Sequence, residues 1–135
     1  MAHYATELFI RCTYSLELSY DELLELEAEL KLAVNALLER HEADFIHFEP
    51  LGDTMRVQCV FSNYDEQLFH SMCEGMAPHM DGRVEGRLLF VHKDLDTVHF
   101  YAVNNKKWRE SRIALPPSGQ QGQHDAMSGA CGETA

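Results

Sequence analysis

The chain has 135 residues, of which 45% are hydrophobic, and it carries a formal net charge of -11. This length and apolar content suit a single domain that buries its own core without a metal or a disulfide. The negative charge argues against a general affinity for nucleic acid, because proteins bind duplexes by neutralising phosphates with Lys and Arg.

No apolar run is long enough to cross a bilayer, and residues 1–7 lack the basic and apolar regions of a secretory signal. The sequence therefore predicts no membrane association. The cysteines form no Cys-x-x-Cys pair, and two of them fall on the apolar side of alternating segments. We expect a cytoplasmic protein with reduced, structural thiols.

The first predicted elements are a strand and a helix. Residues 4–18 alternate between apolar and polar side chains, which predicts a long half-buried strand. Ser19 and Glu22 then form a capping box, the pattern in which two side chains satisfy free backbone donors at a helix start. Apolar residues at helical spacing predict a helix over 20–41: Leu23, Leu26, Leu30, Val34 and Leu37.

A similar alternation continues along the chain. Residues 44–49 and 54–61 predict two strands on either side of a Pro- and Gly-containing turn. Asn63 and Glu66 repeat the capping-box pattern, so a second, shorter helix should begin there and end near Ala77. Three more strands are predicted after this helix: 84–92, 97–103 and, at the sheet edge, 108–114.

This order of elements predicts an α+β fold. Two β-α-β units indicate a ferredoxin-like βαββαβ sandwich with one or two added C-terminal strands, in which two helices cover one face of an antiparallel sheet. The domain should span residues 1–115, and the polar, Gly-rich segment 116–135 should form a disordered tail. Apolar residues on the uncovered face, such as Phe9 and Val60, would favour contact with a second sheet or a sister chain.

The sequence predicts neither a metal site nor a cofactor. His70, Cys73 and His79 come nearest to a ligand set, but Gly75 and Pro78 interrupt the helix that would align them. The glycines are scattered, and carboxylates occupy the predicted helix starts, where a phosphate-binding loop would lie. A Gly-x-Ser-x-Gly motif is also absent.

Two histidines sit in apolar strand segments, His47 between Ile46 and Phe48 and His99 between Val98 and Phe100. This arrangement resembles the paired strand histidines of the two-histidine phosphodiesterases. In that family a Thr or Ser follows each histidine two positions later, whereas Glu49 and Tyr101 stand there in this chain. The resemblance implies an alternative function, a His-dependent phosphodiesterase-like enzyme that uses His47 and His99.

The positive charge is concentrated near the C-terminal end of the domain. Residues 1–81 contain 4 basic and 16 acidic side chains, whereas residues 82–115 contain 7 basic and 4 acidic ones. Within this basic region, cationic side chains surround the only tryptophan, which suits contact with anions or stacked bases. The alternative is a solvated turn in which the tryptophan covers the end of the sheet. The predicted binding residues are Lys106, Lys107, Trp108, Arg109 and Arg112.

Because no catalytic set converges, the sequence favours a non-enzymatic binding or interaction module that forms a homodimer or binds a protein partner. The basic segment of one chain could meet the acidic first helix of another. A further alternative is an acidic protein that mimics nucleic acid and inhibits a nucleic-acid-binding protein. The sequence identifies no small-molecule ligand.

Overall fold

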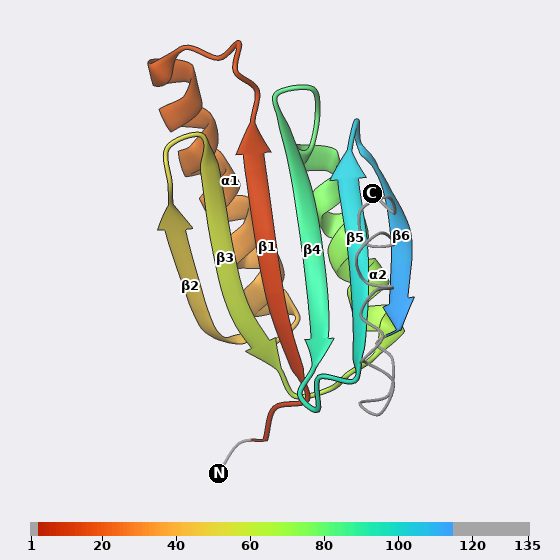
Figure 1. Cartoon of the computed structure of the whole chain (residues 1–135). Coiled ribbons are helices and arrows are strands. Elements are labelled where there is room, and N and C mark those ends of the chain that lie inside the picture. The colour runs from red at the N-terminus through yellow and green to blue at the C-terminus, as the bar shows by residue number, and fades with distance from the viewer. Residues whose placement is uncertain (1–2, 115–135) are drawn as a thin grey trace, which may run out of the picture.

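The computed structural model describes residues 3–114, which form six strands and two α-helices (Figure 1). The predicted tail, residues 116–135, lies outside the described residues. The elements are β1 (Thr6–Tyr14), α1 (Tyr20–Arg40), β2 (Asp44–Pro50), β3 (Thr54–Phe61), α2 (Glu66–Met76), the short 3-10 helix η1 (Ala77–His79), β4 (Val84–His92), β5 (Thr97–Asn104) and β6 (Lys107–Ala114).

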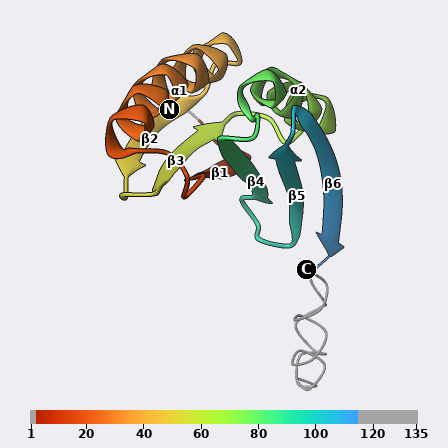
Figure 2. The same cartoon turned by 90° about the horizontal axis from the view of Figure 1, so that it is seen from above.

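All the strands belong to one sheet with the order β2-β3-β1-β4-β5-β6, and every neighbouring pair is antiparallel. Figure 2 shows that both helices lie on the same side of this sheet. The predicted α+β class and the antiparallel sheet with two helices on one face are therefore confirmed, and the ferredoxin-like arrangement with one or two added C-terminal strands stays a prediction. The opposite side of the sheet, which no described helix covers, is called the open face below.

The start of α1 follows from its capping box. The Ser19 hydroxyl accepts a hydrogen bond of 3.1 Å from the Glu22 backbone N–H, and the Glu22 carboxylate accepts one of 2.9 Å from the Ser19 backbone N–H. The predicted box is confirmed. It fixes the register of a 21-residue helix whose apolar stripe packs on the sheet.

The second predicted capping box is wrong. Helix α2 begins at Glu66, and its N-cap is Asp65, whose side chain accepts a hydrogen bond of 3.1 Å from the Gln67 backbone N–H. The backbone carbonyl of Asn63 instead accepts a 2.7 Å hydrogen bond from the Thr6 hydroxyl. Because this bond holds Asn63 against the start of β1, the chain turns into the helix two residues later.

The core lies between the sheet and the two helices. Phe69 of α2 is fully buried and stacks on Phe90 of β4, with ring centroids 4.1 Å apart. The helices approach each other closely at Gly75, where an added Cβ would lie 2.5 Å from the Leu37 Cδ1 atom. In the part of the chain that the structure describes, neither helix combines the length and the apolar character needed to cross a membrane.

The first strand is shorter at both ends than the sequence predicted. Strand β1 covers Thr6–Tyr14 rather than residues 4–18. After Tyr14 the backbone N–H of Ser15 bonds to the Arg83 carbonyl, and Leu16 points into solvent. The apolar alternation therefore continued past the paired residues into the loop that leads to α1.

Edge strand β2 is irregular. Its pairing with β3 shifts register between Asp44 and His47, and Phe45 within this bulge has a positive φ of 55° and an exposed side chain. The strand ends at Pro50, which has no backbone N–H to donate.

Candidate functional site

Arginines from four strands lie on one lateral line across the open face. In the register of the sheet, Arg11 of β1 stands directly opposite Arg56 of β3 on one side and Arg87 of β4 on the other. The same lateral line continues through Ala102 of β5 to Arg109 of β6. We call these four arginines, Arg56, Arg11, Arg87 and Arg109, the arginine row.

This row concentrates like charge in a protein that is acidic as a whole. Like charges directly opposite each other on neighbouring strands destabilise a sheet. Arg56 is compensated by Glu49 of β2, at 3.2 Å, and Arg87 lies over the Phe100 ring, 5.8 Å from its centroid. Arg11 makes no ion pair with any residue in the described part of the chain. An anion bound over the centre of the row would remove this electrostatic cost.

Apolar side chains flank the arginine row. Two residues further along the strands, Phe9, Leu89 and Phe100 stand opposite one another on β1, β4 and β5. Together with the row's central arginines they line a shallow hollow of about 260 Å³ on the open face. The surface therefore combines a line of cations with a parallel apolar line, which suits a partner that is both acidic and apolar.

The outward side of α1 carries the opposite pattern. Asp21, Glu25 and Glu29 are exposed and follow one another at four-residue intervals. Beside them, Leu24 and Leu32 are 44% and 76% exposed although they lie on a helix with a well-packed inner stripe. These residues, with the exposed Ala28, form what we call the acidic-apolar stripe of α1.

The structure divides the binding residues that the sequence predicted. Lys106 lies in the turn before β6, and Lys107 and Arg109 border a shallow hollow of about 300 Å³. Trp108 is turned to the other side of the sheet, where it packs against the core and its ring lies 5.0 Å from that of His70. Arg112 pairs with His99 in the backbone register, and its side chain lies outside the described part.

His47 and His99 do not share a pocket. His47 is exposed on edge strand β2 and stands opposite Gln58 on the open face, whereas His99 is buried on β5 on the side that the helices cover. Three strands, β3, β1 and β4, lie between them. The geometry that a two-histidine phosphodiesterase requires is therefore absent for this pair.

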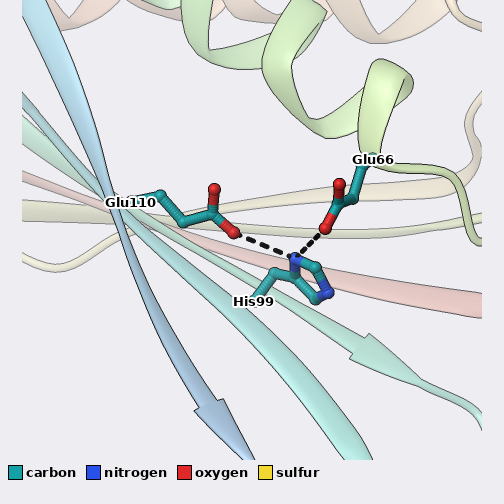
Figure 3. A group of neighbouring side chains, drawn as sticks. All are labelled: Glu66, His99 and Glu110. Carbon is teal, nitrogen blue, oxygen red and sulfur yellow. Dashed lines mark ion pairs between the residues drawn. The ribbon is translucent and has the colours of Figure 1, made fainter.

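His99 instead faces carboxylates. Its side chain is 6% exposed, and its Nδ1 atom lies 3.3 Å from Glu110 Oε2 and 3.7 Å from Glu66 Oε2. Figure 3 shows that Glu66, from the start of α2, and Glu110, from β6, both point their carboxylates toward this nitrogen. The Tyr101 hydroxyl lies 3.4 Å from the same atom. Burial, and then the nearby Glu110, raise the pKa of Tyr101, so the phenol stays protonated.

The three residues that came nearest to a metal-ligand set in the sequence, His70, Cys73 and His79, do not lie together in the structure. Cys73 is buried in the core, while His70 lies on the side of α2 that faces β6, with its Nε2 atom 3.5 Å from Glu110 Oε1. His79 is exposed on η1. His70 therefore belongs with the side chains around His99, a grouping that the linear spacing did not predict.

The described thiols are expected to be unreactive because they are buried. Cys12, Cys59 and Cys73 are free and buried, and burial raises the pKa of each thiol to about 12. In a Cys131→Ser variant, we expect no thiol to react with Ellman's reagent at pH 8 while the protein is folded, because attack requires an accessible thiolate. All three should react after denaturation. One rapidly reacting thiol in the folded variant would contradict this assignment.

The residues of the open face could have been identified only in part from the sequence. Arg11, Arg56 and Arg87 each occupy a polar position of an alternating strand, which places each one on a solvent-facing side. Their alignment depends on strand order and register, which single segments do not carry.

No protein-family model matches the chain, and no curated protein matches it either.

Proposed function

We propose that the protein is a non-enzymatic interaction module whose copies associate head to tail, with helix α1 of one copy lying across the open face of the next. The arginine row carries this proposal. Arg56, Arg11 and Arg87 stand opposite one another with no carboxylate between them in the described sheet, which costs stability in the isolated chain, and an acidic partner offsets that cost.

The charges of the two surfaces are complementary in spacing as well as in sign. Neighbouring strands lie about 4.8 Å apart, which sets the interval between Arg56, Arg11 and Arg87. Four residues of α-helix rise about 6 Å, which sets the interval between Asp21, Glu25 and Glu29. Long arginine side chains accommodate the difference, so one helix laid across the strands places three carboxylates over three guanidinium groups.

The apolar parts of the two surfaces match in the same way. The line of Phe9, Leu89 and Phe100 beside the arginines corresponds to Leu24, Ala28 and Leu32 beside the carboxylates. Burial of the exposed leucines would contribute about 25 cal/mol for each Å² of apolar surface removed from water. This match favours a second copy of the chain over a mobile anion such as phosphate, which has no apolar surface to bury.

Head-to-tail contact has a consequence for assembly size. The open face and the outer side of α1 lie on opposite sides of the molecule (Figure 2), so each copy retains one free surface after the contact forms. Such heterologous association continues until the geometry closes a ring. The smallest assembly is a dimer, and the mean mass of the assemblies should rise with protein concentration.

Sedimentation velocity tests the proposal. The full chain should associate with a dissociation constant of about 10–100 µM, as small interfaces do. Arg11→Glu should weaken this association by about 100-fold. The new carboxylate on the open face would repel the three carboxylates of the partner helix. Raising the salt concentration should also weaken the association.

Lys93→Glu is the matched control, because it makes the same change of charge at an exposed residue of the β4–β5 turn, away from the row. It should associate like the wild type. A wild-type chain that stays monomeric at about 1 mM would contradict the proposal, as would equal association of the Arg11→Glu variant. Binding of a single-stranded oligonucleotide that Arg11→Glu abolishes would identify a different occupant for the same face.

A further inference from the structure

The side chains around His99 leave its ring nitrogen in an unusual position. The Nδ1 atom has three oxygen neighbours, from Glu66, Glu110 and Tyr101, at 3.7, 3.3 and 3.4 Å. A hydrogen bond between a ring nitrogen and an oxygen normally measures about 2.7–3.2 Å, so both carboxylates lie beyond that range from Nδ1. The Tyr101 hydroxyl is itself a donor and hydrogen-bonds to Glu110, so only the two carboxylates compete for the ring N–H.

The same distances suit atoms that share a metal ion. Ligand atoms about 2.0–2.1 Å from a tetrahedral ion lie about 3.3–3.4 Å from one another. One ligand atom from each of Glu66, His99 and Glu110 lies within 4.8 Å of the other two. Figure 3 shows the two carboxylates directed at the ring nitrogen from different elements, which leaves the region between the three side chains as the place where an ion would be shared.

His70 is a further polar neighbour of Glu110. It lies one turn after Glu66 on α2, and its Nε2 atom is buried without a hydrogen-bond partner among residues 3–114, at 3.5 Å from the second oxygen of Glu110. Histidines and carboxylates beyond the ligands commonly orient a metal-binding side chain in this way.

We propose that Glu66, His99 and Glu110 bind one divalent transition-metal ion of the Zn²⁺ class, with His70 orienting Glu110. An imidazole nitrogen with carboxylate oxygens is a donor set that such ions accept, and the two carboxylates balance the charge of a divalent ion. The ion would join α2 to strands β5 and β6, including the sheet edge. This site lies on the helix-covered side of the sheet and is independent of the proposed self-association.

Titration calorimetry with Zn²⁺ tests the site. All proteins carry Cys131→Ser, which removes a thiol that could bind the ion elsewhere, and the three described cysteines are buried. We expect one ion per chain. Glu110→Gln should abolish measurable binding, and His70→Asn should weaken it by about 10–100-fold, as loss of an orienting partner does.

A second group of side chains provides a matched control. His92 Nδ1 lies 3.6 Å from Asp94 Oδ2 and 3.7 Å from Asp96 Oδ1, but these carboxylates are exposed on a turn. Asp96→Asn should therefore bind Zn²⁺ as its parent does. Absence of a saturable site, unchanged affinity in Glu110→Gln, or equal loss in Asp96→Asn would overturn the proposal.

Folding is controlled with a second variant and a second probe. Glu66 is 47% exposed in the first turn of α2, so Glu66→Gln should fold even if a change in the more buried Glu110 does not. It should weaken Zn²⁺ binding and remove the intense visible absorption of a tetrahedral Co²⁺ complex in the parent protein. A folded Glu66→Gln variant with parental Zn²⁺ affinity would also overturn the proposal.

Discussion

Replacing Phe69 with alanine is expected to lower the free energy of unfolding by about 3–5 kcal/mol, the range for loss of a buried aromatic side chain. The ring is fully buried, stacks on Phe90 and meets the edge of Tyr64 at a centroid distance of 5.0 Å. It therefore joins α2 to β4 and to the segment that precedes the helix. Urea unfolding followed by circular dichroism measures the change.

Two variants separate packing from a general effect of substitution. Phe69→Leu keeps most of the buried volume and should cost less than the alanine change. Leu16→Ala removes an exposed side chain in the loop before α1 and should change stability by less than about 0.5 kcal/mol. A Phe69→Ala variant as stable as the wild type would show that this ring does not hold α2 against the sheet.

Two variants that cannot associate alone are expected to associate when mixed. In the first, Arg11→Glu with Arg87→Glu reverses the charge of the open face. In the second, Glu25→Arg with Glu29→Arg reverses the charge of α1. Each variant opposes like charges across the proposed contact, which costs several kcal/mol and so weakens association by at least about 100-fold.

In a mixture, the acidic open face of the first variant meets the basic α1 of the second. The acidic α1 of the first variant meets the basic open face of the second, so mixing restores complementary charge at every contact. Equimolar mixtures should therefore form alternating assemblies with a mean mass above that of either variant alone, measured by light scattering. A mixture whose sedimentation equals the sum of its components would exclude α1 as the occupant of the open face.

Much of the fold could be predicted because the local patterns persist over whole elements. The alternation in β3 and β4 and the helical spacing in α1 place these elements within one or two residues of their observed bounds. The start of α2 was missed because Asn63 and Asp65 both suit an N-cap, and the tertiary hydrogen bond from Thr6 decides between them.

The candidate site was less accessible to prediction. Alternation within β6 sends Arg109 to the open face and Trp108 to the core, so a segment that is continuous in sequence is split in space. Arg11 and Arg87 come together through the pairing of β1 with β4, and His99 meets Glu66 through the packing of α2 on β5. These groupings depend on long-range register and packing, which the composition of a segment does not determine.

The irregular edge at β2 limits how copies of the protein can meet. A regular outer strand offers a row of unpaired backbone donors and acceptors on which another chain can extend the sheet. The bulge at Phe45 misaligns that row, and Pro50 removes a donor at its end. Growth by strand addition is thereby disfavoured at β2, so copies of the protein are not expected to join through a continuous cross-chain sheet at this edge.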